Sequence, residues 1–162
     1  MSEITLKALT PNPIYLDFNP ADAQAHTLDA YRKRQGYAAW GNVKSRFKPE
    51  DFVQNIKNAN LWGRGGAGFP AGTKWGFLPK TSDKPIYLCI NADEGEPGTF
   101  KDRVIMEFNP HQLIEGVLLT CYAIRSKTAY IYVRGELSLA KDRLQKAIGE
   151  AQKAGLLEDI QV

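Results

Sequence analysis

Two loops in the middle of the sequence carry residue types that suit a phosphate-bearing, flat-ringed ligand. The first is glycine-rich and contains Gly63, Gly65, Gly66 and Gly68. Without Cβ atoms, these residues can adopt positive φ and let backbone N–H groups approach an anion closely. Arg64 and Lys74 can neutralise that anion, and the aromatic residues beside them are Phe69, Trp75 and Phe77. The stretch therefore predicts an anion site with aromatic surface, although Trp75 and Phe77 could instead belong to the core.

The glycine spacing alone does not identify the ligand. Gly63, Gly65 and Gly68 satisfy the dinucleotide pattern G-x-G-x-x-G, but that pattern should follow a β-strand, and residues 49–60 read as a helix. The phosphate-loop pattern fails as well, because Thr73 separates Gly72 from Lys74. A plain glycine-rich surface loop stays open as an interpretation.

The second loop is acidic and follows a short β-rich run at 86–90. Its polar residues are Asn91, Asp93, Glu94 and Glu96. Ligands of open α/β sheets bind beyond the carboxyl ends of strands, and these side chains can accept hydrogen bonds from ribose hydroxyls or ring N–H groups. A solvated acidic turn is the simpler interpretation, and residues 101–103 also read as a solvated ion cluster.

The hydrophobic pattern indicates the elements that must position these loops. Helices are expected at 27–34, 49–60, 110–125 and 137–154, with a further turn or two at 38–47, and strands at 86–90 and 129–133. The order strand, helix, strand, helix predicts an α/β fold with a parallel sheet. Residues 1–26 are expected to form an extended arm. We divide the chain into an amino-terminal arm with short helices, 1–48, and a partial α/β domain, 49–162.

Composition excludes several classes of function. The chain has 162 residues, 43% of them hydrophobic, and a net charge of +3, which is too small to suggest nucleic acid binding. No apolar run reaches the eighteen or so residues of a membrane span, and no signal peptide is evident, so we expect a cytoplasmic protein without direct membrane insertion. Cys89 and Cys121 lack metal-binding spacing and are expected to be buried free thiols, and neither His26 nor His111 is expected to be functional.

The two loops, GRGGAGFPAGTKW and NADEGEPGTFKDR, together resemble the flavin-binding subunit of NADH:quinone oxidoreductase, respiratory complex I. The resemblance runs from about Tyr31 onward and extends to relatives in soluble hydrogenases and formate dehydrogenases. It implies the amino-terminal part of a Rossmann-like FMN-binding domain, incomplete at its carboxyl end. It also implies a [4Fe–4S] cluster in a carboxyl-terminal part that is not in this chain.

The same resemblance assigns roles to individual residues. It implies FMN contacts from Gly63, Arg64, Gly65, Gly66, Lys74, Asn91, Asp93 and Glu94. It implies NADH contacts from Phe69, Phe77 and Glu96. No side chain of this chain is expected to be catalytic, because the hydride passes between cofactors. Gly95 stands where members of the family often carry a larger residue.

The function that the resemblance implies is NADH oxidation: hydride transfer to FMN, with electrons passed on to iron–sulfur clusters and quinone. The implied partners are NADH and other subunits of an electron-transfer complex, including a small [2Fe–2S] subunit, on the cytoplasmic side of the inner membrane. Two alternatives stay open, namely the flavin subunit of an NAD-linked hydrogenase or formate dehydrogenase, and a non-catalytic nucleotide-binding module.

Overall fold

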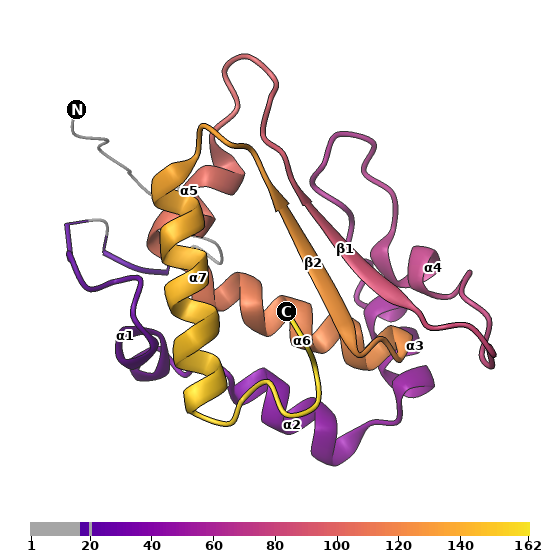
Figure 1. Ribbon diagram of the computed structural model, residues 1–162. Coiled ribbons are helices and arrows are strands. Elements are labelled where there is room, and N and C mark those ends of the chain that lie inside the picture. The colour runs from indigo at the N-terminus through magenta and orange to yellow at the C-terminus, as the bar shows by residue number, and fades with distance from the viewer. Residues whose placement is uncertain (1–16, 20) are drawn as a thin grey trace.

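A computed structural model describes residues 17–19 and 21–162 as helices packed around a small parallel sheet (Figure 1). The helices are α1 (Leu28–Lys33), α2 (Ala38–Arg46), α3 (Pro49–Asn58), α4 (Ala71–Trp75), α5 (Lys101–Phe108), α6 (Pro110–Ile124) and α7 (Ser138–Lys153). The strands are β1 (Tyr87–Ala92) and β2 (Thr128–Val133). The predicted α/β class and parallel sheet are confirmed.

The sheet is built by parallel pairing of β1 with β2, from Tyr87 opposite Thr128 to Ala92 opposite Val133. A parallel pair needs a crossover, and α5 and α6 provide it. Beyond α7 the chain returns to β2, where Ala129 N–H donates to the Gln161 carbonyl at 2.8 Å and a parallel bridge joins Thr128 to Gln161. Because β1 and β2 pair in parallel, their carboxyl ends lie at the same edge of the sheet.

Helix α6 is the centre of the core. Ile114, Leu118 and Cys121 have no exposed surface, and they pack with the inward residues of both strands and with α1, α2 and α7. Pro110 begins the helix, as the sequence predicted. Burial raises the pKa of the Cys121 thiol to about 11, as expected for an inert thiol. The helix covers one face of the sheet, and the face towards the viewer in Figure 1 is open.

The open face corrects one prediction. Cys89 is exposed rather than buried, because side chains alternate along β1 and Cys89 points away from α6. Tyr87, Tyr130 and Tyr132 are exposed on the strands as well.

The described residues before α1 are more closely packed than an arm over the surface would be. Most of the expected arm, residues 1–16 and 20, lies outside the described residues. Of the rest, Phe18 and Ala25 are buried with Val104, and the Phe18 ring stacks on Phe108 with centroids 5.8 Å apart. The expectation of a surface arm is therefore wrong for this part. The division of the chain at residue 48 stays a prediction.

Helices α4 and α5 were not predicted from the sequence. Helix α4 is a single turn that follows Pro70, too short to show periodicity. Helix α5 begins at Lys101, so Lys101, Asp102 and Arg103 form its first turn rather than a separate cluster, although Lys101 does pair with Asp102 at 2.7 Å. The helix at 27–34 is confirmed as α1, with Thr27 as its amino-terminal cap.

A buried glutamate ties α2 to α6. The Glu115 carboxylate accepts hydrogen bonds from the Tyr31 hydroxyl at 2.5 Å, from Tyr37 N–H at 2.9 Å and from Trp40 N–H at 3.0 Å. Helix α2 has no capping side chain of its own, so Glu115 supplies the acceptors for its first turn. Burial, reinforced by Glu115, raises the pKa of Tyr31, which keeps its hydroxyl protonated as a donor.

We expect Glu115→Gln to destabilise the fold by about 1–3 kcal/mol, because the amide NH2 would face a buried donor and leave it without an acceptor. Glu158→Gln is the matched control: its carboxylate pairs with Lys44 at the surface, and such pairs contribute about 0–1 kcal/mol. Urea unfolding followed by circular dichroism measures both. Equal losses in the two variants would contradict the capping role of Glu115.

Candidate functional site

The glycine-rich loop is held at its base by a short antiparallel closure. Gly63 N–H donates to the Phe69 carbonyl at 2.9 Å, Ala71 N–H donates to the Leu61 carbonyl at 2.8 Å, and Trp62 bridges Pro70. Between these contacts the chain turns through exposed residues 63–67. The closure fixes the loop's ends and leaves its backbone open to a ligand.

Positive φ explains two of the four glycines. Gly66 has φ 120° and Gly68 has φ 62°, conformations that favour glycine. Gly68 also lies under the Trp62 ring, whose nearest carbon would be 3.5 Å from an added Cβ. Gly63 and Gly65 are not required by φ. An added Cβ on Gly63 would stand 3.3 Å from the Phe69 carbonyl oxygen, to which its own N–H donates, whereas one on Gly65 would meet nothing within 4 Å. Of these two glycines, Gly65 is therefore the one that leaves its backbone open.

Helix α4 contains Lys74 and Trp75, and Phe77 follows it. Gly72 allows it to pack on α3 at close range, since a Cβ there would stand 2.7 Å from the Lys57 backbone nitrogen. Lys74 is exposed, whereas Trp75 is half-buried against Phe52, so the core interpretation holds for Trp75. Phe77 is 72% exposed and is not part of the core.

Phe69 and Phe77 form an exposed aromatic pair, with ring centroids 6.0 Å apart and an angle of 51° between the rings. Phe69 lies at the end of the glycine-rich loop and Phe77 just after α4, so the pair joins the two segments. Nearly half of Phe69 is accessible to solvent. Two exposed rings in contact offer a surface on which a flat ring can stack.

The acidic loop continues from the carboxyl end of β1 and is shaped by its own side chains. The Asn91 side-chain oxygen accepts from Asp93 N–H at 3.0 Å, which turns the chain out of the strand. Glu94 accepts from the N–H groups of Asp102 and Arg103, both at 2.9 Å, and so caps α5. Helix α5 has no side-chain cap of its own. Glu96 is exposed, and within the described part of the chain its carboxylate has no hydrogen bond.

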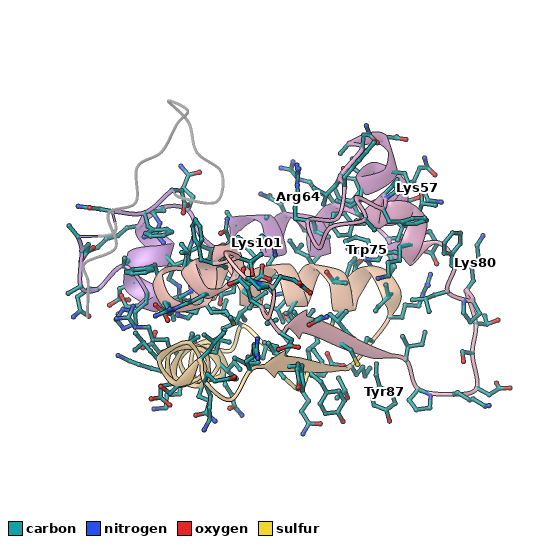
Figure 2. All side chains as sticks on the ribbon, turned by 90° about the horizontal axis from the view of Figure 1, so that it is seen from above. Lys57, Arg64, Trp75, Lys80, Tyr87 and Lys101 are labelled. Carbon is teal, nitrogen blue, oxygen red and sulfur yellow. The ribbon has the colours of Figure 1, made fainter. Side chains whose placement is uncertain are left out.

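Both loops lie at the carboxyl end of the strands. Figure 2 shows Arg64 and Lys101 on the side to which β1 points, while Tyr87 and Lys80 lie at the other end of the sheet. Arg64 of the glycine-rich loop and Lys101, just after the acidic loop, therefore lie at the same end of the sheet, whereas α4, which carries Lys74, lies beside the start of β1 (Figure 1). Arg134, which follows β2 and lies 3.5 Å from the Asp93 carboxylate, was not predicted from the sequence. The parallel pairing of the strands could have indicated it, because this pairing places the residue after β2 beside the residue after β1.

The donor set fits an anionic ligand with a flat ring, and it does not fit a metal. Open backbone, Arg64 and Lys74 suit a phosphate, and the exposed aromatic pair suits a ring. Across residues 17–19 and 21–162, no group of three or more His, Cys, Asp or Glu side chains could hold a metal ion. Within the same residues, no helix is both long and apolar enough to cross a membrane.

The fold is that of an α/β protein with two loops whose residues suit an anionic ligand, and comparison with known proteins identifies the family. Residues 56–162 match the family described as the Nuo51 FMN-binding domain, and the chain belongs to this family. Similar proteins include an NADH-quinone oxidoreductase subunit of Rhizobium meliloti, 54% identical over 132 residues, which are 82% of this chain and 31% of that protein. An NADH-quinone oxidoreductase subunit of Streptomyces coelicolor is 48% identical over 83% of this chain and 30% of its own length.

A solved structure shares the fold. An NAD+-reducing [NiFe]-hydrogenase, crystallised in the air-oxidized state, superposes with a TM-score of 0.62 and 40% sequence identity. The match covers 70% of this chain and 19% of the hydrogenase chain. This chain spans about a third of the length of the curated relatives it matches.

We expect Gly72→Ala to destabilise the protein by about 1–3 kcal/mol, because the new methyl group would collide with the Lys57 backbone. Relieving that collision requires α4 to shift away from α3. Gly116→Ala, in the middle of α6 with nothing within 4 Å of an added Cβ, should instead add up to about 1 kcal/mol of stability. Thermal unfolding of both variants checks the prediction. A neutral Gly72→Ala would show that α4 is not held at close range.

Proposed function

We propose that this chain supplies one wall of an FMN and NADH site in an NADH-oxidising flavoprotein. The observation that carries the proposal is the gathering of the glycine-rich and acidic loops at the carboxyl edge of the sheet, in a chain of the FMN-binding family. Arg64, Gly63, Gly65 and Gly66 would hold the phosphate with Lys74. Asn91, Asp93 and Glu94 would contact the ribityl chain or the ring.

The NADH subsite is proposed beside the flavin. Phe69 and Phe77, the exposed pair 6.0 Å apart, would stack on the adenine, and Glu96 would face the nicotinamide half. Bound FMN would accept a hydride from NADH, so the chain's own residues bind, orient and neutralise rather than act as acid or base. Asn91 shapes the start of the loop through its bond with Asp93 N–H, and Glu94 would connect ligand binding to the first turn of α5, whose N–H groups it accepts from.

The proposed setting is a subunit of NADH:quinone oxidoreductase. The R. meliloti and S. coelicolor relatives are named as subunits of that enzyme, and in the proposed assembly electrons pass from FMN to iron–sulfur clusters and quinone. The cluster chain would include a [4Fe–4S] cluster outside the residues of this chain and a small [2Fe–2S] partner subunit. The complex would be attached to the cytoplasmic side of the inner membrane.

A second function is favoured by the structural match. The NAD+-reducing hydrogenase shares 40% identity with this chain, so the same flavin module could serve a soluble hydrogenase. The two functions differ in the electron acceptor and not in the site. A non-catalytic nucleotide-binding module is the third hypothesis, and it predicts binding without turnover.

Phosphate recognition is tested by comparing FMN with riboflavin, which lacks the phosphate. We expect the chain to bind FMN weakly but more tightly than riboflavin, and Arg64→Met to reduce that preference severalfold by removing a charge-assisted contact. Lys80→Met, at the opposite end of the sheet, should leave it unchanged. Quenching of flavin fluorescence measures each affinity. Equal binding of the two flavins by the unaltered chain would contradict the proposed phosphate site.

Turnover is tested in a chimera in which this chain replaces the matching third of the R. meliloti relative. We expect the chimera to hold flavin and to reduce ferricyanide with NADH, because this segment, 54% identical to the one it replaces, should supply the same flavin contacts. The unaltered relative is the positive control, and a chimera carrying Arg64→Met should be less active at limiting FMN. A folded, FMN-loaded chimera without NADH oxidation would favour the non-catalytic hypothesis.

A further inference from the structure

Arg134 is the first residue after β2, at the carboxyl edge of the sheet. The parallel register ends with Ala92 opposite Val133, so Asp93 and Arg134 are the first residues to leave the two strands, side by side. The acidic loop begins at Asp93. Parallel pairing therefore puts a guanidinium where the loop starts, and nothing in the sequence spacing between residues 93 and 134 would indicate it.

The guanidinium makes two ion pairs there and lies close to Gly95. Its Nε lies 3.5 Å from Asp93 Oδ1, and one terminal nitrogen lies 3.2 Å from Glu136 Oε1. The other terminal nitrogen lies 2.7 Å from the point where a Cβ on Gly95 would stand. Arg134 thus lies against the backbone of Gly95 and is held between two carboxylates, with its side chain 37% exposed.

We propose that Arg134 is a positioning residue, which holds the Asp93–Gly95 segment of the acidic loop against the edge of the sheet for flavin binding. Gly95 is the residue that makes room for it. This inference deepens the proposed function, because Asp93 and Glu94 are proposed FMN contacts. It concerns how they are held and assigns Arg134 no contact with the flavin.

Charge and geometry both explain why an arginine suits this position. The loop carries three carboxylates within four residues, Asp93, Glu94 and Glu96, and an approaching phosphate ester is also negative. A cation beside Asp93 reduces the repulsion that the loop would present to such a ligand. The planar guanidinium can also reach two carboxylates at once, which a lysine ammonium cannot do in the same way.

The first test follows the loop without ligand. Glu94 N–H donates to the Ala92 carbonyl and Gly95 N–H to the Asp93 carbonyl, both at 3.1 Å, so their solvent exchange in NMR reports on the loop. Arg134→Met should speed their exchange by about two- to fivefold, in line with an exposed ion pair. Gly95→Leu, whose side chain would displace the guanidinium, should do the same, and Arg134→Lys should restore only part of the protection.

Arg125→Met is the matched control. Arg125 is 36% exposed, pairs with Glu50 and lies just before the other end of β2. It should leave the Glu94 and Gly95 amides unchanged. Unchanged exchange in Arg134→Met, or an equal effect of Arg125→Met, would overturn the inference.

The second test measures FMN affinity in Arg134→Met, Asp93→Asn and the double variant. We expect Arg134→Met alone to weaken FMN binding about two- to fivefold, and to have little further effect once Asp93 is changed. Full additivity, or a loss of FMN binding matched by a fall in melting temperature, would overturn the positioning role. If the unaltered chain shows no preference for FMN over riboflavin, the proposed function fails, while the exchange experiment still decides the role of Arg134.

Discussion

The parallel pairing of β1 with β2 is the constraint on which the arrangement depends. Two parallel strands cannot be joined by a tight turn, so the chain must cross back over one face, and α5 and α6 are that crossover. The same pairing brings both carboxyl ends to one edge, where residues 93–96 and Arg134 meet. The position of the acidic half of the candidate site is therefore a consequence of strand direction, whereas the glycine-rich loop follows α3 and is held by its own closure.

Two glutamates connect distant segments by capping helices that lack caps of their own. Glu115 in α6 accepts from the amino-terminal turn of α2, and Glu94 in the acidic loop accepts from that of α5. In each case the carboxylate meets the positive end of a helix dipole as well as unpaired N–H groups. Glu94 is itself a proposed flavin contact, and it caps the helix that leads into α6. A change in the acidic loop should therefore affect how α5 and α6 pack in the core.

The sequence was most informative where periodicity or capping is local. Pro110 and Thr27 marked helix starts correctly, and the two β-rich runs were placed to within a few residues. Contacts between residues far apart in the chain were not predictable in this way. The Glu94 cap spans eight residues, beyond the three of a capping box, and the Arg134 contact spans forty-one along the chain. Sequence could name the residues of the loops but not the partners that hold them.

The error at Cys89 has a physical reason that bears on the sheet as a whole. The apolar run of β1 reads as a strand buried on both faces, which is the usual condition of a parallel strand in α/β proteins. In the described part of the chain, helices cover only the face that contains Leu88 and Ile90, and the other carries Cys89 with exposed tyrosines. The sequence of β1 is therefore typical of a strand in a sheet that is covered on both faces. Because the chain spans about a third of its curated relatives, the covering elements of such a sheet should be sought in the other two thirds of those proteins.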